Sequence, residues 1–575
     1  MPESNKRGLP WLMILWSILL VCLTVLPRIY IAEVEEATDL GLDFIGFITL
    51  LTGALFFLSW TLWCLFFSGW RWWRRLFGAA LTQAIPVGLI ALLFLGYVVP
   101  VGGDLNAFQW RRKPANLTTS VDAASGVDLA VETANDFPGY LGPDQTGAIN
   151  IAEIDADRFS EARTLWKKKV GEAWSGFATR NGFAVTMEQR NEFECVTCYD
   201  IQSGDLKWMY KHKARHHEFM GKTGPRATPM IYKGRVYAVG ALGNFVCLNG
   251  QDGSVVWQKD IKEILGVEVE EKTDPDGLVY QWESNSTLAW GRAGSPIIVD
   301  DTVVVPGGAT GQKTEDGWAQ DDGAATLLAF DLNTGELKWK GGDQMIGYAT
   351  PTLVTLDGRK QIIITAEAMI LGVDAKTGEQ LWSHPRDGQS NGMANTSQLS
   401  VINKNQILSA KGYPDGGGEL LTITQKDGKF VPVSEWKNKR VLKTKLTSPV
   451  IHDGHAYALS NGFMECTRVE DGKRLWKQRG RFGHGQLLLV GDKLLLQTEE
   501  TGKLMLIQAT PDSYEQLGEI DTGIDGICWN TLCLSGNKLL LRSDREAACI
   551  ELSVAAKQTK DDATNRGQQP GVLNQ

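Results

Sequence analysis

A nine-residue pattern that recurs at constant spacing limits the fold of this 575-residue chain more than any other feature. It consists of Asp or Asn, three residues, Gly, three residues and Trp. Such a pattern predicts a hairpin, because an Asp or Asn side chain closes the turn on backbone amides, Gly takes a positive φ and Trp lies on the returning strand. The copies are Asp200, Gly204, Trp208; Asn249, Gly253, Trp257; Asp331, Gly335, Trp339; Asp374, Gly378, Trp382; and, with the first residue changed, Arg468, Gly472, Trp476.

A further strand pair precedes each hairpin, as in Ala227–Tyr232 and Arg235–Val239. Four short strands at a period of roughly 40 to 50 residues are typical of a β-propeller blade. One more hairpin begins at Thr424 and Gly428, and we interpret its late Trp436 as the result of an insertion after the turn. Two final units lack their Trp, so we count eight blades, or seven if one of these units is not a blade.

The last unit lacks an outer strand, whereas the segment Ala162–Lys169 is a strand without a unit of its own. We therefore predict that this segment, with Trp166, completes the last blade and closes the ring. Closure removes the open sheet edges that otherwise invite aggregation.

Two copies of the pattern, Asp331-Leu-Asn-Thr-Gly-Glu-Leu-Lys-Trp339 and Asp374-Ala-Lys-Thr-Gly-Glu-Gln-Leu-Trp382, resemble the repeat of the pyrroloquinoline-quinone-like (PQQ-like) propeller family. The resemblance covers about Phe137 to Val554 and implies an all-β propeller. Members of this family divide into quinoprotein dehydrogenases and cofactor-free propellers similar to the scaffold lipoprotein of the outer-membrane β-barrel assembly machinery. The vicinal Cys-Cys pair of many quinoprotein alcohol dehydrogenases is absent, which counts against that activity.

Three uncharged stretches precede the repeats: Leu9–Leu26, Phe44–Trp70 and Leu76–Gly103. Each is long enough to cross about 30 Å of hydrocarbon, which predicts three transmembrane α-helices in contact with lipid. The predicted organisation is a membrane anchor at 1–103, a linker at 104–135, the propeller at 136–556 and a disordered tail at 557–575.

Basic residues set the predicted orientation of the anchor. They precede the first stretch and separate the second from the third, whereas the loop after the first stretch is acidic. By the positive-inside rule the N-terminus is cytoplasmic, and three crossings place the propeller in the periplasm, on a bacterial inner membrane. The basic residues are Lys6, Arg7, Arg71, Arg74 and Arg75.

Charge and motif content exclude several classes of function. A net charge of -9 leaves no surplus of Lys and Arg for nucleic-acid binding. No motif for a nucleophile elbow, a zinc protease, a phosphate loop or a dinucleotide site stands at a suitable strand-to-helix junction. His216 and His217 are adjacent, but a zinc site would also need a third ligand at defined geometry, so we expect a solvated loop and no metal site. No catalytic residue is predicted.

Long connections fall into two classes that share one propeller face: between blades, as in Lys259–Ala289, and between second and third strands, as in Gly307–Ala325 and Lys411–Gly418. Binding usually resides on such loops. We expect the acidic insertions to form a solvated rim, with Ca²⁺ or a basic protein partner as the alternative. Their acidic residues are Asp260, Glu263, Glu268, Glu270, Glu271, Asp274, Asp276, Glu283, Glu315, Asp316, Asp321 and Asp322.

Six residues of the same connections are candidates for the channel mouth: Glu188, Arg190, Arg226, Trp290, Arg292 and Glu367. Trp290 is suited to stack on a flat cofactor, and the Arg residues are suited to bind carboxylates, as PQQ with Ca²⁺ would require. The alternative, which we favour, is that Arg and Glu pair across the narrow channel.

The sequence therefore predicts a non-catalytic binding or scaffolding module, held in the membrane by three helices, with a protein partner on its acidic loop face and no cofactor assigned. The alternative is a PQQ-dependent quinoprotein dehydrogenase that oxidises alcohols or sugars and passes electrons to membrane quinone. That alternative arises because a helical anchor also precedes the propeller in membrane glucose dehydrogenases.

Overall fold

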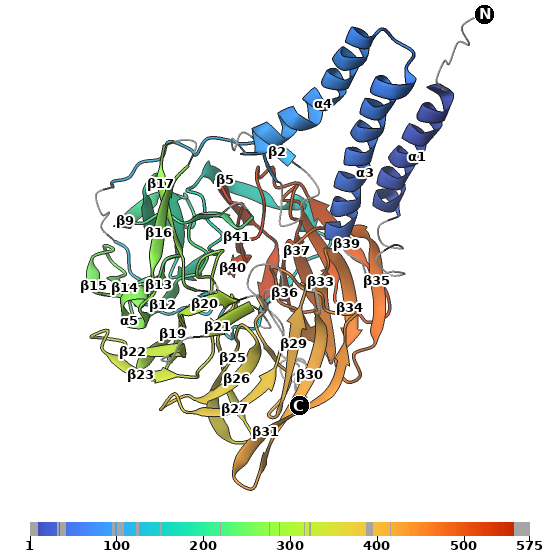
Figure 1. Ribbon diagram of the computed structural model, residues 1–575. Helices are drawn as coiled ribbons and strands as arrows, with labels where there is room; N and C mark the ends of the chain where they lie inside the picture. The colour runs from blue at the N-terminus through green and yellow to red at the C-terminus, as the bar shows by residue number, and fades with distance from the viewer. Residues whose placement is uncertain are drawn as a thin grey trace, which may run out of the picture.

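The computed structural model describes residues 10–30, 34, 42–94, 98–100, 108–121, 126–149, 152–218, 220–274, 277–286, 288–314, 317–320, 324–386, 395–413 and 416–556. Within these ranges three long helices precede a ring of β-sheets (Figure 1). The predicted tail at 557–575 and part of the predicted linker lie outside the described residues.

The helices of the anchor are α1 (Pro10–Ile29), α3 (Leu42–Leu62) and α4 (Trp72–Phe94), and a π-helical turn, η1 (Trp63–Phe67), extends α3. Each helix is long and apolar enough to cross a membrane. The third ends at Phe94 and is followed by strand β1 (Val98–Pro100).

Polar side chains inside the anchor bond across the helix contacts. Trp16 Nε1 donates to Ser59 Oγ at 3.0 Å, and Gln83 Nε2 donates to Thr61 Oγ1 at 2.7 Å. Side chains that hydrogen-bond across helices are the usual means of holding such a bundle together in hydrocarbon. Gln83 therefore contributes to helix packing.

Eight sheets form a ring of blades (Figure 1), and the four strands of each blade are antiparallel, with the first strand nearest the centre of the ring. Blades one to four are β6 (Ala178–Arg180), β7 (Phe183–Arg190), β8 (Phe193–Asp200), β9 (Leu206–Lys213); β12 (Met230–Tyr232), β13 (Arg235–Val239), β14 (Asn244–Asn249), β15 (Val255–Asp260); β18 (Ile297–Val299), β19 (Thr302–Gly308), β22 (Ala325–Asp331), β23 (Leu337–Gly341); and β24 (Thr352–Leu356), β25 (Arg359–Thr365), β26 (Met369–Asp374), β27 (Gln380–Pro385). Blades five to eight are β28 (Ser400–Val401), β29 (Gln406–Lys411), β30 (Gly417–Lys426), β31 (Lys429–Asn438); β32 (Val450–His452), β33 (His455–Ser460), β34 (Phe463–Arg468), β35 (Arg474–Arg481); β36 (Gln486–Val490), β37 (Lys493–Gln497), β38 (Leu504–Gln508), β39 (Gln516–Ile520); and β40 (Cys533–Ser535), β41 (Lys538–Arg542), β42 (Glu546–Glu551), β5 (Arg163–Lys169).

Short elements decorate this ring. They are β2 (Phe108–Trp110), which pairs with β1; β3 (Ala148–Ile149), which adds to β36; β4 (Ala152–Ile154) with β43 (Val554–Ala556); the 3₁₀ turn η2 (Phe159–Glu161); β10 (His217–Glu218) with β11 (Lys222–Thr223); α5 (Ile261–Leu265); β16 (Val269–Thr273) with β17 (Val279–Glu283); and β20 (Gly311–Thr314) with β21 (Gly317–Gln320).

The propeller closes by the N-terminal strand β5, which forms the outer strand of blade eight. In that sheet β5 pairs with β42, with Trp166 opposite Cys549. The prediction of a closed propeller is confirmed, and the number of blades is eight.

Five Trp residues, each on the outer strand of its blade, also join that blade to the next one. Trp208 Nε1 donates to the carbonyl of Gly250 at 2.9 Å, and a Cβ added to Gly253 would lie 2.6 Å from the Trp208 ring. The Gly of one hairpin therefore makes room for the indole of the preceding blade. The same relation links Trp166 to Gly204, Trp257 to Gly335, Trp339 to Gly378 and Trp436 to Gly472.

The hairpin of blade five does not contain the insertion after its turn that the sequence suggested. Its strands β30 and β31 are ten residues each, and Trp436 pairs with Leu420. The extra residues lengthen both strands of the hairpin instead of following its turn, so Trp436 still reaches Gly472 of blade six.

Candidate functional site

The two faces of the propeller are defined by its connections. The turn face carries the tight turns between first and second and between third and fourth strands, and the loop face carries the connections between second and third strands and between blades. Hairpin β16–β17 stands between blades two and three, and hairpin β20–β21 stands between β19 and β22, so both belong to the loop face. Asp276, Glu315, Asp316, Asp321 and Asp322 lie outside the described residues.

The acidic residues of the first insertion have different roles. Asp274 pairs with Arg215 at 3.3 Å, and Glu283 pairs with Arg292 at 2.8 Å, both with buried side chains. Among the described residues no group of three or more His, Cys, Asp or Glu could hold a metal ion, so the Ca²⁺ interpretation of the rim has no ligand set there. Glu263, Glu268, Glu270 and Glu271 are exposed on this insertion.

The segment that follows the anchor crosses the loop face (Figure 1). Arg190 Nη1 donates to the carbonyl of Thr118 at 2.7 Å, and Arg111 lies 3.5 Å from Asp274 of the first insertion. The loop face is therefore the face to which the membrane anchor connects.

Two of the predicted Arg residues pair with carboxylates, but they do so locally and not across the channel. Glu188 and Arg190 lie on the same strand, β7, with 2.9 Å between Oε2 and Nη2. Burial disfavours the charge on Glu188, but Arg190 and Arg542 outweigh burial and hold its pKa below the usual value. Arg292 pairs with Glu283 of hairpin β16–β17. The predicted pairing across the channel is therefore wrong in its geometry.

The histidine pair is not in a solvated loop. His216 is fully buried, with its Nδ1 3.1 Å from the carbonyl of Gln281, and His217 Nδ1 lies 2.9 Å from Thr223 Oγ1. Burial lowers the pKa of His216 well below its usual value and that of His217 to about 4. The expectation of solvation is wrong because hairpin β16–β17 covers this segment, with Tyr280 5.2 Å from the His217 ring.

A cavity of about 160 Å³ lies in the central channel, and it brings together two of the six predicted residues, Arg226 and Trp290. Glu188, Arg190, Arg292 and Glu367 do not line it. The other lining residues are Tyr140, Trp174, Met220, Gly221, Thr228, Ala293, Tyr348, Thr350, Thr396, Tyr413, Leu446, Trp529 and Thr531.

Seven blades contribute to the cavity from one equivalent position, which we call the ring position. It lies four residues before the first residue of the innermost strand, at the loop-face end of the blade. In chain order its occupants are Trp174, Arg226, Ala293, Tyr348, Thr396, Leu446 and Trp529. The sequence analysis missed most of these residues, although their constant offset from each blade start was a signal that could have found them.

The turn-face end of the channel is crossed by the segment that leads into the propeller. The carbonyl of Pro138 accepts from the Ile231 amide of blade two at 2.7 Å, and strand β3 adds to β36 of blade seven. Between these points Tyr140 lines the cavity, and burial raises its pKa. The lead-in segment therefore closes the cavity at its turn-face end.

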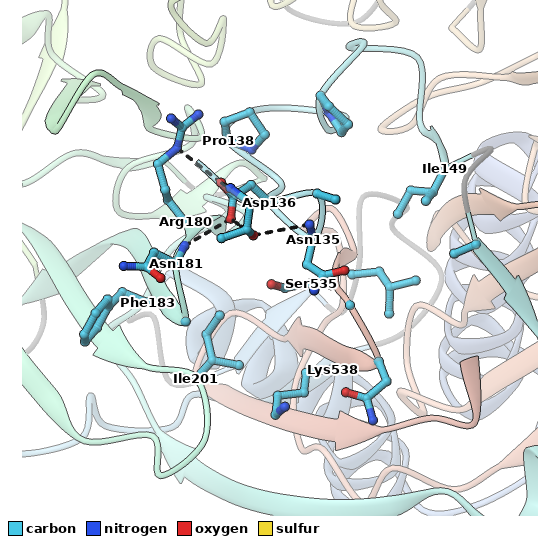
Figure 2. A pocket seen from close by; sticks show the side chains of 18 of the residues that line it. Asn135, Asp136, Pro138, Ile149, Arg180, Asn181, Phe183, Ile201, Ser535 and Lys538 are labelled. Atoms are coloured by element: carbon cyan, nitrogen blue, oxygen red, sulfur yellow. Dashed lines mark hydrogen bonds and ion pairs between the residues drawn. The ribbon is translucent and has the colours of Figure 1, made fainter. Parts of the chain in front are cut away.

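A larger hollow of about 1210 Å³ lies on the turn face, between the lead-in segment and blades one and eight (Figure 2). Three of its charged groups pair with one another: Arg180 lies 2.6 Å from Glu132 and 3.6 Å from Asp136. Asp136 also accepts the Asn181 amide at 3.0 Å. These contacts fasten the lead-in segment to blade one.

PQQ does not fit the channel cavity as it stands. Sites for ligands of that size usually have volumes of ~300–1,000 Å³, whereas this cavity has about 160 Å³. Trp290, the predicted stacking residue, already stacks on Tyr348 at 5.1 Å and 20°.

Comparison with known proteins gives two kinds of relative. A family model described as outer membrane protein assembly factor BamB matches residues 151–339 and 281–511, more than half of the chain. The quinoprotein glucose dehydrogenase of Escherichia coli K12 is 22% identical over 280 residues, which are 44% of this chain and 32% of that protein. The chain thus spans about a third of the length of this relative.

Solved structures of both kinds are also similar. BamB from Moraxella catarrhalis is 14% identical with a TM-score of 0.44, and the match covers 68% of this chain and 100% of that chain. The quinohemoprotein alcohol dehydrogenase ADHIIG from Pseudomonas putida HK5 is 11% identical with a TM-score of 0.48, and the match covers 78% of this chain and 85% of that chain.

Proposed function

The chain belongs to the family described as outer membrane protein assembly factor BamB, and we propose that it is a non-catalytic binding or scaffolding propeller with a protein partner on its loop face. We further propose that residues 1–103 hold it in a bacterial inner membrane and that the propeller lies in the periplasm. The charge distribution around the helices supports this orientation.

The observation that carries the proposal is that the polar residues of the loop face are mostly committed to the fold. Glu188 pairs with Arg190, Glu283 with Arg292 and Asp274 with Arg215. Buried ion pairs of this kind support a rigid frame and provide no group free to exchange protons. The exposed acidic residues of the first insertion are Glu263, Glu268, Glu270 and Glu271, and charge of one sign steers a partner of the opposite sign.

Site-specific photocrosslinking in living cells tests the proposal. A photoreactive amino acid replaces Val279 on the loop-face hairpin, which is 49% exposed, or Val256 on the outer strand of blade two, which is 41% exposed. We expect a discrete protein adduct at position 279 that weakens when Glu268, Glu270 and Glu271 are changed to Gln, and no such adduct at 256. Equal adducts at both positions, or none at 279, would contradict a partner on this face.

The alternative is a PQQ-dependent dehydrogenase, which the quinoprotein relative favours. Titration of the full chain with PQQ and Ca²⁺, together with dye-linked oxidation of alcohols and sugars, separates the two functions. Saturable binding with dye reduction would establish the enzyme, whereas we expect neither, because the cavity is smaller than the cofactor requires.

A further inference from the structure

The cavity at the ring position contains one guanidinium, that of Arg226, among largely aromatic walls. Arg226 Nη2 donates to the carbonyls of Gly221 at 2.6 Å and Lys222 at 3.2 Å, and Nη1 donates to that of Gly224. A guanidinium has five N–H groups, so these bonds leave the Nε–H and a second Nη1–H. Among the described residues no carboxylate forms an ion pair with Arg226, and those of Glu218 and Glu194 act on its charge only from a greater distance.

Arg226 differs in this respect from three neighbouring arginines. Arg190, Arg215 and Arg292 are buried and each has a carboxylate partner, as a buried charge normally requires, whereas Arg226 is partly exposed. Burial lowers the pKa of Arg226 to about 10, which reflects the cost of its charge there. A negatively charged ligand group in the cavity would offset that cost and make use of the remaining donors.

The walls on both sides of Arg226 are aromatic. In ring order Arg226 of blade two stands between Trp174 and Trp529 of blades one and eight, whose rings are 4.5 Å apart, and the stacked pair of Trp290 and Tyr348. Such surfaces favour a flat ring by offset stacking or edge contacts. The volume of about 160 Å³ is close to that of an engineered cavity of roughly 150 Å³ that binds benzene.

We propose that the channel cavity is a binding site for a single-ring aromatic carboxylate, with the carboxylate on Arg226 and the ring between the two aromatic pairs. The site is reached from the loop face, because Tyr140 and the lead-in segment close its other end. The proposal does not rest on the scaffolding function, and it concerns a ligand much smaller than PQQ.

The test is calorimetric titration of the full chain in detergent micelles with benzoate and 4-hydroxybenzoate. Two matched ligands separate charge from shape: benzamide keeps the ring without the charge, and cyclohexanecarboxylate keeps the charge without the aromatic face. We expect saturable binding of one aromatic acid per chain and at least tenfold weaker binding of both matched ligands. Equal binding of benzamide, or no binding of either aromatic acid, would overturn the proposal without any variant.

Variants then locate the site. Arg226→Gln should weaken binding of the aromatic acid at least tenfold, and Arg226→Lys should weaken it less. Arg235→Gln is the control, because Arg235 also belongs to blade two and also donates to carbonyls, those of Leu332 and Asn333, but outside the cavity. Unchanged affinity in a folded Arg226→Gln protein would overturn the assignment. The crosslink at position 279 is an independent measurement, so failure of one proposal leaves the other standing.

Discussion

The turn face and the loop face belong to the same eight blades but follow opposite rules. On the turn face the same residue types recur, since a hairpin Gly receives the Trp of the preceding blade at five of the joints. On the loop face the ring position is equivalent in seven blades, yet it holds Trp, Arg, Ala, Tyr, Thr, Leu and Trp. Repetition therefore builds the frame, and variation at one position per blade makes the candidate site.

The largest loss of stability should come from removing a Trp that joins one blade to the next. Trp208 is fully buried and bonded to Gly250, so Trp208→Ala should lower the free energy of unfolding by about 4 kcal/mol. On the loop-face hairpin Trp282 is only half-buried, with Lys272 4.1 Å from its ring, and Trp282→Ala should cost less than about 1 kcal/mol. Denaturant unfolding of the full chain, followed by near-ultraviolet circular dichroism, measures both. An equal loss of unfolding free energy in the two variants would show that the repeat Trp residues do not hold neighbouring blades together.

A matched pair of glycines sharpens the same comparison. Gly378 and Gly358 both have positive φ, +74° and +79°, so Ala at either position pays about 1 kcal/mol of backbone strain. At Gly378 the added Cβ would also lie 2.4 Å from the Trp339 ring, whereas at Gly358 nothing lies within 4 Å. We expect Gly378→Ala to cost about 3 kcal/mol and Gly358→Ala about 1 kcal/mol in the same unfolding experiment. If the two variants have the same free energy of unfolding, the contact between Gly378 and Trp339 is not tightly packed.

The two faces should lose stability at different pH values when the solution is acidified. His216 and His217 have folded-state pKa values below 6.5, so the unfolded chain binds their protons first and stability falls as pH drops from 6.5 toward 4. Turn amides hold the pKa of Asp331 below 3.8, so the repeat turns lose stability only under more acidic conditions. Hydrogen exchange, corrected for intrinsic rates, should therefore show hairpin β10–β11 opening by pH 5 while the turn at 331–335 stays protected.

Three buried carboxyl groups have the opposite sign. Burial raises the pKa of Glu194 to about 7 and also raises the pKa of Glu172 and of Glu465 above 4.5, so these groups make the fold more stable as pH falls toward 4.5. His217→Gln removes one of the two destabilising protons and should shift opening of β10–β11 to lower pH. If exchange in the variant keeps the pH dependence of the original chain, the histidines do not cause the opening.

The frame was predictable because its signal is repeated. The hairpin pattern, the closure by Trp166 and the positions of the long loop-face connections can all be read from a repeat spacing that occurs several times within this one sequence. Blade five shows the limit of this reasoning: the late Trp436 indicated an insertion, but a hairpin can also lengthen by adding residues to both strands, and the pairing of Trp436 with Leu420 decides between these possibilities.

The site was less predictable, because it depends on which partners each side chain finds. Arg190, Arg226 and Arg292 are equivalent candidates by sequence, but two of them pair with Glu188 and Glu283, and only Arg226 lines the cavity. Tyr140 belongs to the lead-in segment, which is not part of any repeat, so the repeats do not predict its path across the turn face. Long-range contacts of this kind have no local sequence signal.

The smallest expected change in stability concerns the segments that cross the two faces, the lead-in segment on the turn face and the linker on the loop face. On the turn face the lead-in segment is bonded through buried backbone groups, such as the Thr179 amide to the Phe137 carbonyl at 2.7 Å. On the loop face the linker is held partly by an exposed ion pair between Arg112 and Asp525, each 52% exposed. Arg112→Gln should therefore change the free energy of unfolding by less than about 0.5 kcal/mol. Salt should loosen this pair but not the buried bonds.

The readout for this difference is hydrogen exchange of residues 108–121 against residues 137–149 at 50 mM and 500 mM salt. Faster exchange of the first segment alone, either in high salt or in Arg112→Gln, would mean that the cover of the loop face is removable while the lead-in segment that contains Tyr140 is not. That asymmetry would give ligands and partners one route to the channel, from the side of the membrane anchor. Equal responses of the two segments would instead mean that the linker is as much a part of the frame as the lead-in.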